Sequence, residues 1–384
     1  MLRTKFLRSV ALACMLIVGL AARPAFAFDT TAEYGVLVDA ETGAILWEKG
    51  ADVPMHPASM SKLMTLYMLF DALKAGTVKL DSQLPISEHA WRTGGAASGS
   101  STMFAELGSS IPVEILIQGI IVQSGNDACI AVAEALSGSE TAFAEAMTVR
   151  GKELGLTNST FANSTGWPDP NQMMTSHDLA TLARHLIKDH AEYYHYFSEK
   201  EFTWNGIVQH NRNPALFVDP SVDGLKTGHT EASGYGLVAS AKRGDQRLIL
   251  VLNGMPSMKA RSEESVRILD WGFRSFKSYK LFTANAVVEN APVWQGTYAQ
   301  VPLVASQDVS VIMTPAQRQA MKVSVRYDTP IPAPIAAGQQ VGTLTIEVPE
   351  KTTLQIPLVA GGNVEQLGIF GRGMAALRHM IFGS

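Results

Sequence analysis

The sequence predicts an α+β protein in which a mixed domain of helices and strands is followed by a small all-β domain. Three observations indicate this class. Strand pairs joined by turn residues lie near the start and near the end of the first 280 residues, and amphipathic helices lie between them. Beyond about residue 280, short β-branched runs alternate with turn residues. With 384 residues, the chain is long enough for two domains with a core each.

The N-terminal segment predicts an export signal. Basic residues in "MLRTKFLRSV" precede the apolar run "VALACMLIVGL", and Ala25-Phe26-Ala27 has the small residues of a cleavage site. The alternative is a transmembrane anchor, but the run has about half of the ~20 apolar residues that a span needs. We therefore expect residues 1–27 to be a signal peptide. Its removal takes four basic residues away, so the net charge changes from -4 to -8.

The composition argues against two classes of function. The net charge of -4 and the lack of a basic, aromatic-rich patch give no indication of nucleic acid as a partner. The nine histidines show no ligand spacing such as H-E-x-x-H, so we expect neither a metal nor another cofactor. Cys129 is the single cysteine after the signal and lies in the apolar run "ACIAVAEAL", which predicts a small buried side chain.

The elements of the first domain, which we expect to span residues 28–280, follow in order. "EYGVLVDAETGAILWEKGAD" predicts a hairpin with its turn at residues 41–43. A helix follows in "SKLMTLYMLF", with Pro57 at its entry and Gly76 after its last turn. Further helices are expected in "IPVEILIQGIIVQ", "DACIAVAEALSG", "ETAFAEAMTVRGKELGL" and "SHDLATLARHLIKDH". Strands return in "SGYGLVASAKRGDQRLILVLNGM", and the helix "RSEESVRILDWGFRSF" closes the domain.

The second domain, residues 281–362, is expected to be all-β. Its strands are predicted in "AVVENAPVWQG", "VPLVASQDVSVIMTP", "MKVSVRYD", "GQQVGTLTIEVP" and "KTTLQIPLVAG". This segment contains no catalytic cluster, so we interpret it as a spacer or docking module.

The C-terminal segment, residues 363–384, predicts an amphipathic helix. One face is apolar and carries Leu367, Phe370, Met374, Leu377 and Ile381 at spacings of three and four. Three cationic or titratable residues fall off that face: Arg372, Arg378 and His379. The helix either packs on the body of the protein or lies in a membrane interface, and it is too short and too charged to span a bilayer. We favour the membrane surface as its partner.

Ser59 and Lys62 open the predicted helix at positions i and i+3, so their side chains project from the same face. A serine hydroxyl becomes a nucleophile only when a base takes its proton. A lysine serves as that base when burial and a second cation keep it neutral. The alternative is a pair of polar residues that face solvent at a helix start.

Ser124 and Asn126, in "VQSGNDA", lie at the corner between two predicted helices. Either side chain could cap the helix that follows. Alternatively, Ser124 relays a proton to the leaving group and Asn126 bonds a substrate amide.

Lys226, Thr227 and Gly228, in "VDGLKTGHT", are the third motif. One interpretation is a polar turn that precedes a strand. The other is an edge strand on which a substrate backbone lies, with Gly228 permitting close approach. Lys226 then lowers the pKa of Lys62 and, with Thr227, attracts a substrate carboxylate. The backbone N–H groups of His229 and Ser59 form an oxyanion hole in this interpretation.

The three motifs in this order resemble those of the penicillin-binding proteins, specifically the low-molecular-mass serine D-alanyl-D-alanine carboxypeptidases. The resemblance also includes "SSTMF", "KELGLTN", "QHNRNPALF" and "LDWGFR", and it covers essentially the whole chain after the signal. It implies a β-lactamase/transpeptidase-like sandwich, with an antiparallel sheet flanked by helices, followed by a small β-sandwich. It also implies a periplasmic protein that is attached peripherally to the outer face of the inner membrane.

The resemblance implies that Ser59 attacks the D-Ala-D-Ala bond of a peptidoglycan stem peptide, with neutral Lys62 as the base. Ser124 and Lys226 would protonate the departing D-alanine, and water would hydrolyse the acyl-enzyme. Arg261, in "KARSEES", matches the arginine of the family that organises the carboxylate end of the site, and Arg212 is a further candidate. β-Lactams would act as inhibitors, and the implied roles are peptidoglycan remodelling and cell shape.

Three alternatives remain at this point. A class A β-lactamase uses a loop glutamate for deacylation, whereas the comparable loop here, "FANSTGWPDPNQMMTS", offers Asp169 and no glutamate. A D,D-endopeptidase differs only in the bond that enters the site. A wall-binding protein without activity would have no physical reason to keep three intact motifs.

Overall fold

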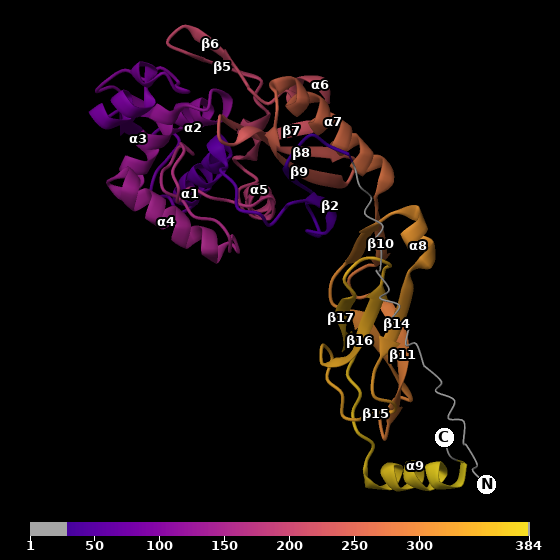
Figure 1. The fold of residues 1–384 in the computed structure, drawn as a ribbon. Helices are drawn as coiled ribbons and strands as arrows, with labels where there is room; N and C mark the ends of the chain where they lie inside the picture. Colours follow the sequence, from indigo (N-terminus) through magenta and orange to yellow (C-terminus); the bar gives the residue numbers. More distant parts are fainter. Residues whose placement is uncertain (1–28, 383–384) are drawn as a thin grey trace, which may run out of the picture.

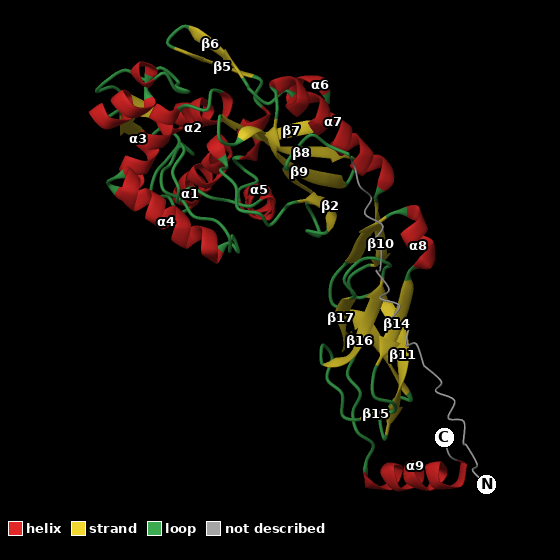
Figure 2. Ribbon diagram, in the orientation of Figure 1, coloured by secondary structure: helices red, strands yellow, loops and turns green. Residues whose placement is uncertain are grey.

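The computed structural model describes residues 29–382, and the expected signal peptide, residues 1–27, lies outside them. Two folded regions follow each other along the chain (Figure 1). The first contains helices around a sheet, and the second is a narrow β-rich region with the C-terminal helix at its far end (Figure 2). This arrangement confirms the predicted fold class.

A five-stranded antiparallel sheet in the order β2-β1-β9-β8-β7 forms the centre of the first region. Its strands are β1 (Tyr34–Asp39), β2 (Ile45–Lys49), β7 (Val222–Thr230), β8 (Gly234–Arg243) and β9 (Gln246–Met255). The hairpins β1–β2 and β8–β9 match the prediction. The interpretation of residues 226–228 as a turn is wrong, because they lie inside β7, whose pairing with β8 extends through them. β7 forms one edge of the sheet, which leaves one side of its backbone open to an added strand.

Helices cover both faces of this sheet. Their bounds are α1 (Lys62–Lys74), α2 (Val113–Val122), α3 (Asn126–Ser137), α4 (Glu140–Glu153), α5 (Ser176–Asp189), α6 (Ala215–Val218) and α7 (Met258–Ser275). Leu237 and Leu250 share an apolar cluster with Ile268 of α7. Val238 and Ile249, on the opposite face, share a larger cluster with α1 and α5. Because neighbouring strand residues point to opposite faces, the sheet separates two cores. Two short strand pairs lie outside this sheet: β3 (Gln83–Pro85) with β4 (Ser110–Pro112), and β5 (Glu201–Trp204) with β6 (Ile207–His210).

α1 is buried around almost its whole circumference. Leu63, Leu66, Leu69 and Phe70 are all fully buried in the larger core. A helix that is apolar on all sides is stable only inside a core. Lys62 is the first residue of α1, so the helix carries its amine into the interior, where its exposure is 0%.

The second region is built from short strands, as the sequence predicts. Their bounds are β10 (Lys277–Phe282), β11 (Val287–Trp294), β12 (Gln300–Ala305), β13 (Val309–Met313), β14 (Lys322–Arg326), β15 (Ile331–Pro332), β16 (Gln340–Glu347) and β17 (Leu354–Ala360). Six of them form a sheet in the order β14-β16-β17-β12-β11-β15, and β10 pairs with β13. β10 therefore crosses the boundary that we expect after residue 280. The short helix α8 (Pro315–Ala320) was not predicted, although Thr314 and Gln317 form a capping box at its start.

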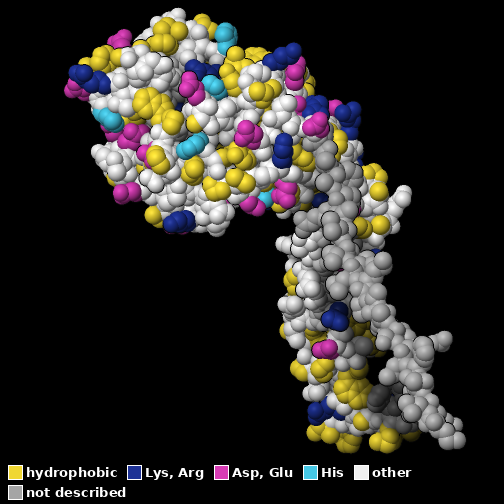
Figure 3. Space-filling model, viewed as in Figure 1, with side chains coloured by type: hydrophobic (Ala, Val, Ile, Leu, Met, Phe, Trp, Pro, Cys, Tyr) yellow, Lys and Arg dark blue, Asp and Glu magenta, His cyan; other side chains and the backbone are white. Residues whose placement is uncertain are grey.

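The C-terminal helix α9 (Ile369–Phe382) lies at the end of the β-rich region that is remote from the sheet of the first region (Figure 1). Its apolar side chains face outward: Phe370 is 93% exposed and Met374 is 69% exposed. Apolar side chains gather along the outer edge of this end of the molecule (Figure 3). The alternative that α9 packs its apolar face on the body is therefore wrong. Among the described residues, no helix is long and apolar enough to cross a membrane.

The corner between α2 and α3 is held by a buried carboxylate. Asp127, in the first turn of α3, is fully buried. It accepts hydrogen bonds from Thr102 Oγ1 at 2.6 Å and from the backbone N–H groups of Met103 and Ala105, both at 3.0 Å. Four donors, including the N–H of Ala128, thus converge on one side chain. This arrangement ties the loop of residues 102–105 to the start of α3.

Replacing this carboxylate tests its structural role. Asp127→Ala leaves buried donors without acceptors, and we expect a loss of about 3 kcal/mol in the free energy of unfolding, measured by urea denaturation. Asp245→Asn, in the exposed β8–β9 turn, is the matched control and should change stability by less than about 0.5 kcal/mol. Equal stability of the two variants would contradict the role of Asp127.

Candidate active site

Ser59 lies in a 3₁₀ turn, Ala58–Ser61, immediately before α1. Ala58 has φ +48°, a left-handed conformation that is uncommon for a residue with a Cβ. The turn leaves Ser59 half-buried, while Lys62 lies below it in the core. Nζ of Lys62 donates a hydrogen bond of 2.9 Å to Oγ of Ser59. The two side chains are therefore in contact, and the alternative of solvent-facing residues at a helix start is wrong for Lys62.

The amine of Lys62 has a second partner in the loop between α4 and α5. Nζ also donates to the backbone oxygen of Thr165. Burial lowers the pKa of Lys62 from its ordinary 10.5 to about 8, and the positive charge of Arg212 acts in the same direction. A lysine with this pKa is partly neutral near physiological pH, so its amine can accept a proton from a hydroxyl that it touches.

The corner at Ser124 has an unusual backbone and free polar atoms. Ser124 is buried and has φ +63°. Its hydroxyl has no hydrogen-bond partner, and the same is true of Oδ1 of Asn126. Nδ2 of Asn126 donates to Oγ of Ser100 at 3.0 Å. Neither side chain caps α3, so the capping alternative is wrong. Both groups keep hydrogen-bonding capacity for another molecule.

β7 lies directly against the turn that carries Ser59. A Cβ added to Gly228 would be 2.9 Å from the backbone oxygen of Pro57 and 3.1 Å from Cβ of Ala58. Glycine is thus required for this approach. Lys226 and Thr227 are buried on the same strand, and His229 is exposed with its ring stacked on Tyr235, the ring centroids 3.9 Å apart.

Four cationic side chains influence one another at this site. Burial, and then the positive charge of Lys62, lowers the pKa of Lys226 well below its ordinary value. Arg212 and Arg261 add to this effect. The positive charge of Arg212 lowers the pKa of Lys62. The expectation that Lys226 acts on Lys62 in the same direction stays a prediction.

Arg261 is buried in the first turn of α7, so the alternative of a surface position is wrong. Its guanidinium lies 5.6 Å from the centre of the Tyr235 ring, and Nη2 donates to the backbone oxygen of Arg212 at 3.5 Å. Nε has no hydrogen-bond partner. Burial lowers the pKa of Arg261 to about 10, which leaves the group positively charged at neutral pH. Arg261 and Arg212 together supply fixed positive charge beside the two lysines.

Glu140, at the start of α4, is a site residue that the sequence analysis missed. Its Oε1 accepts hydrogen bonds from the backbone N–H of Ser164 at 3.0 Å and from the hydroxyl of Ser164 at 2.6 Å. Ser164 precedes the loop carbonyl of Thr165 that contacts Lys62. A cavity of about 40 Å³ beside it is lined by Glu140, Asn126 and Thr165, among others, and has room for water. The loop of residues 161–176 thus has a glutamate next to it, supplied by α4.

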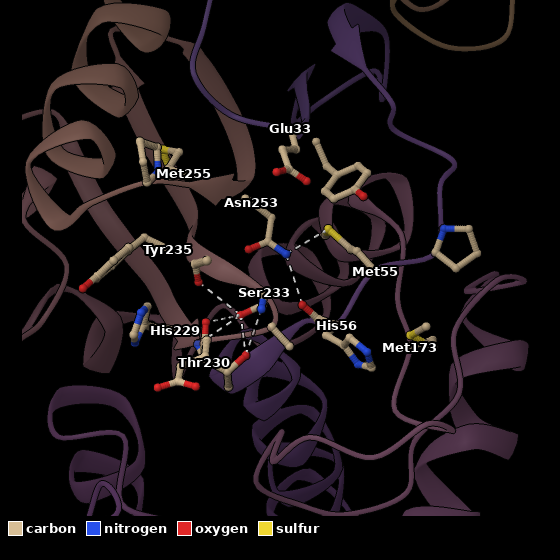
Figure 4. Close-up of a pocket in the computed structure, with 17 residues that line it drawn as sticks. Glu33, Met55, His56, Met173, His229, Thr230, Ser233, Tyr235, Asn253 and Met255 are labelled. Carbon is tan, nitrogen blue, oxygen red and sulfur yellow. Dashed lines mark hydrogen bonds between the residues drawn. The ribbon is translucent and has the colours of Figure 1, made fainter.

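A larger cavity, of about 490 Å³, lies at the end of β7 beyond His229 (Figure 4). It extends from the β7–β8 turn to the start of β1 and the end of β9. No cluster of three or more His, Cys, Asp or Glu side chains that could hold a metal ion occurs among residues 29–382.

These groups suit nucleophilic acyl transfer: a hydroxyl in contact with a poised amine, an open strand edge, and cations beside it. The family profile described as D-alanyl-D-alanine carboxypeptidase matches residues 20–257. The chain belongs to this family. A second profile, penicillin-binding protein 5, C-terminal domain, matches residues 276–366. The chain is therefore a hydrolase of the serine peptidase class, which confirms the predicted family and enzyme class.

Individual carboxypeptidases and penicillin-binding proteins agree with this assignment. The chain is 42% identical to D-alanyl-D-alanine carboxypeptidase DacC of Escherichia coli over 340 residues, 88% of this chain and 85% of the relative. The crystal structure of penicillin-binding protein 5 from Haemophilus influenzae superimposes with a TM-score of 0.80 at 37% identity, covering 88% of this chain and 98% of that one. Penicillin-binding protein D2 of Listeria monocytogenes, in its ampicillin-bound form, gives a TM-score of 0.56 at 26% identity, covering 64% and 98%.

The charges around Lys62 predict how acylation depends on pH. Only the neutral amine accepts a proton, so the rate of acylation by a fluorescent penicillin should fall about tenfold per pH unit below pH 8. The carboxylate of Glu140 favours the charged amine, so Glu140→Gln should move the acidic limb of the pH–rate profile to lower pH. Arg212→Gln removes a positive charge that disfavours the charged amine of Lys62, so it should move the same limb of the profile to higher pH. Glu145→Gln, exposed on α4, is the control. Identical limbs in all four proteins would contradict the role of Lys62 as the base.

Proposed function

We propose that this enzyme removes the terminal D-alanine from peptidoglycan stem peptides that end in D-Ala-D-Ala, through an acyl-enzyme on Ser59. The observation that carries the proposal is the 2.9 Å contact between Oγ of Ser59 and the buried amine of Lys62, beside the open edge of β7. The names of the relatives support the same substrate.

The first step forms an ester. Oγ of Ser59 attacks the carbonyl carbon of the penultimate D-alanine while neutral Lys62 takes the hydroxyl proton. Negative charge then develops on the carbonyl oxygen, and the backbone N–H groups of Ser59 and His229 stabilise it. Asn126 bonds the substrate amide. The substrate lies along β7 as an added strand, which fixes the carbonyl next to Oγ.

The second step breaks the C–N bond. The nitrogen of the departing D-alanine needs a proton, and the hydroxyl of Ser124 passes one on from the lysine pair, Lys62 and Lys226. The carboxylate of this D-alanine is held by Thr227 and Lys226 together with Arg261 and Arg212. Arg261 stays positively charged at neutral pH despite its burial, so its charge is available to the carboxylate whatever the protonation state of Lys226.

Hydrolysis completes the cycle. A water molecule loses a proton to the neutral amine of Lys62, attacks the ester, and releases the shortened peptide with a new carboxyl group. The proton returns to Oγ of Ser59. β-Lactams form the same ester but keep their leaving group attached, so we propose that they inhibit this enzyme. The ampicillin-bound relative supports this part of the proposal.

Replacement of the nucleophile tests the proposed reaction. Ser59→Ala should lose covalent labelling by a fluorescent penicillin, and its release of D-alanine from a D-Ala-D-Ala peptide should fall by at least about 10³-fold. Ser306→Ala, an exposed serine between β12 and β13, should behave like the native enzyme. Labelling of Ser59→Ala at the native rate would overturn the assignment. Rapid release of the label from native enzyme would indicate a β-lactamase instead.

We also propose where the enzyme works. The basic and apolar N-terminal segment, residues 1–27, supports export to the periplasm. The exposed apolar face of α9, with Arg372 and Arg378 beside it, supports peripheral attachment to the outer face of the inner membrane. In this position, residues 281–362 act as a spacer between the membrane and the catalytic domain, and the activity serves peptidoglycan remodelling and cell shape.

The apolar face of α9 can be tested in the full-length mature chain. We expect the triple variant Phe370→Ser, Met374→Ser, Leu377→Ser to lose binding to vesicles with anionic lipids, measured by flotation, because about 2 kcal/mol of burial is lost for each side chain. D-alanine release from a small peptide should stay native. The control Val287→Ser, Tyr298→Ser, Val323→Ser changes exposed apolar residues of the β-rich region. Retained flotation of the α9 variant would rule out this anchor.

A further inference from the structure

The amine of Lys62 needs its lone pair directed at Ser59. A neutral amine has two N–H donors and one lone pair, and only the lone pair can take the hydroxyl proton. The 2.9 Å contact between Nζ and Oγ then has the hydroxyl as its donor. Because Lys62 is fully buried, its N–H groups depend on acceptors inside the protein. The backbone oxygen of Thr165 is such an acceptor.

Asn163 closes the turn that presents this oxygen. Its Oδ1 accepts hydrogen bonds from the backbone N–H groups of Thr165, Gly166 and Trp167, at 3.2, 2.7 and 3.2 Å. It also accepts one from the hydroxyl of Thr165 at 3.0 Å. Nδ2 donates to the backbone oxygen of Trp167 at 3.1 Å. One side chain thus makes five hydrogen bonds within residues 163–167, and it holds the backbone there in the way that asparagine commonly closes turns.

The closed turn packs directly on the 3₁₀ turn that carries Ser59. Gly166 has φ +83°, and a Cβ added to it would overlap the backbone oxygen of Ala58. The same Cβ would lie 2.5 Å from Oγ of Ser61. Ala58 and Ser61 are the two ends of the 3₁₀ turn. The backbone of the loop is therefore in contact with the nucleophile turn, and no side chain lies between them at Gly166.

The loop is also attached to α1. Oγ1 of Thr65 donates to the backbone oxygen of Ser164 at 2.7 Å, and Thr65 lies three residues after Lys62 on the same helix. Residues at this spacing share a helix face, so two consecutive carbonyls of the loop bind side chains on one face of α1. Glu140 binds the N–H and the hydroxyl of Ser164 from α4. These contacts fix the position of Ser164.

The direction of the next carbonyl depends on Asn163. The C=O of Thr165 and the N–H of Gly166 belong to one planar peptide unit, in which the two groups point in opposite directions. The N–H donates to Oδ1 of Asn163 at 2.7 Å, and the oxygen accepts from Nζ of Lys62. Asn163 and Lys62 thus hold opposite sides of the same peptide unit. Rotation of this unit would break both hydrogen bonds, so the side chain of Asn163 sets the direction of the carbonyl.

We propose that Asn163 is a positioning residue for the acylation of Ser59. It acts through the carbonyl of Thr165, which takes one N–H of neutral Lys62 and thereby leaves the lone pair of the amine directed at Oγ of Ser59. This inference rests on the proposed function, because it takes from it the role of Lys62 as the base.

The acylation rate at high pH tests this role in the full-length mature chain. We measure labelling of Ser59 by a fluorescent penicillin up to about pH 9.5, well above the pKa of about 8 of Lys62, where the amine is neutral and the rate reaches a plateau. In Asn163→Ala the plateau rate per labelled molecule should fall about tenfold, because the peptide unit can turn and the lone pair loses its fixed direction.

Two further variants serve as comparisons. Asn163→Asp keeps the acceptor oxygen and loses only the amide donor, so its plateau should stay near the native rate. Thr160→Val removes a hydrogen bond of 2.6 Å to the backbone oxygen of Asn171 in the same loop, away from Lys62, and should label at the native rate. If Asn163→Ala does not fold, Asn163→Ser replaces it with the same expected fall, since a serine hydroxyl closes such turns more weakly.

The plateau separates positioning from a purely structural role. A variant that merely loosens the fold would lower the fraction of enzyme labelled at saturation, or move the acidic limb, while its plateau rate stays native, and that result would overturn the inference. An equal fall in Asn163→Asp would assign the effect to the amide donor and would also overturn it. In both cases the proposed function stands. If the native enzyme carries the label on a residue other than Ser59, the proposed function fails and this inference fails with it.

Discussion

A lysine amine held inside the protein, in contact with a serine hydroxyl, is the constraint on which the active site depends. Water would keep Lys62 protonated, and a protonated amine cannot accept the proton of Ser59. The apolar circumference of α1 removes the water, because a helix of this composition is stable only in a core, and Lys62 is its first residue. The same burial lowers the pKa of the amine to about 8. Packing and catalysis thus have one physical cause.

The remaining groups are brought to this pair by polar contacts and close approaches. Asp127 binds four donors and fixes the corner where Ser124 and Asn126 keep free polar atoms. Glu140 binds Ser164 and thereby holds the loop whose carbonyl contacts Lys62. Gly228 lets β7 approach the nucleophile turn. Each contact joins a loop to a helix or strand of the core, so the site is rigid before substrate arrives.

Electrostatics divide the site into two ends. Lys62, Lys226, Arg212 and Arg261 lie together at the end where the substrate carboxylate is expected. Carboxylates and an unpaired carbonyl oxygen line the cavity beyond His229. The exposed apolar face of α9 is remote from both, so attachment to a surface need not disturb the chemistry (Figure 1).

The sequence by itself determined the α+β class, the two hairpins, most helices, the family and the three polar motifs. Periodicity, turn residues and motif order are properties of the sequence itself, and they can be recognised without knowledge of the fold. Arg212 was named as a candidate, but the sequence did not reveal that its charge acts on Lys62. The helix α8 was missed although its capping box is local.

Only the tertiary structure decided which residues meet. Glu140 lies 24 residues from Ser164 and carried no local signal, yet packing of α4 places its carboxylate next to the loop that holds Lys62. The cavity beside Thr230 combines β1, β9 and the Ser59 segment, which are far apart in the chain. The lowered pKa values of Lys226 and Lys62 likewise depend on distances and burial that no spacing encodes. Contacts between distant segments arise from packing in three dimensions, and they set both the pKa values and the shape of the site.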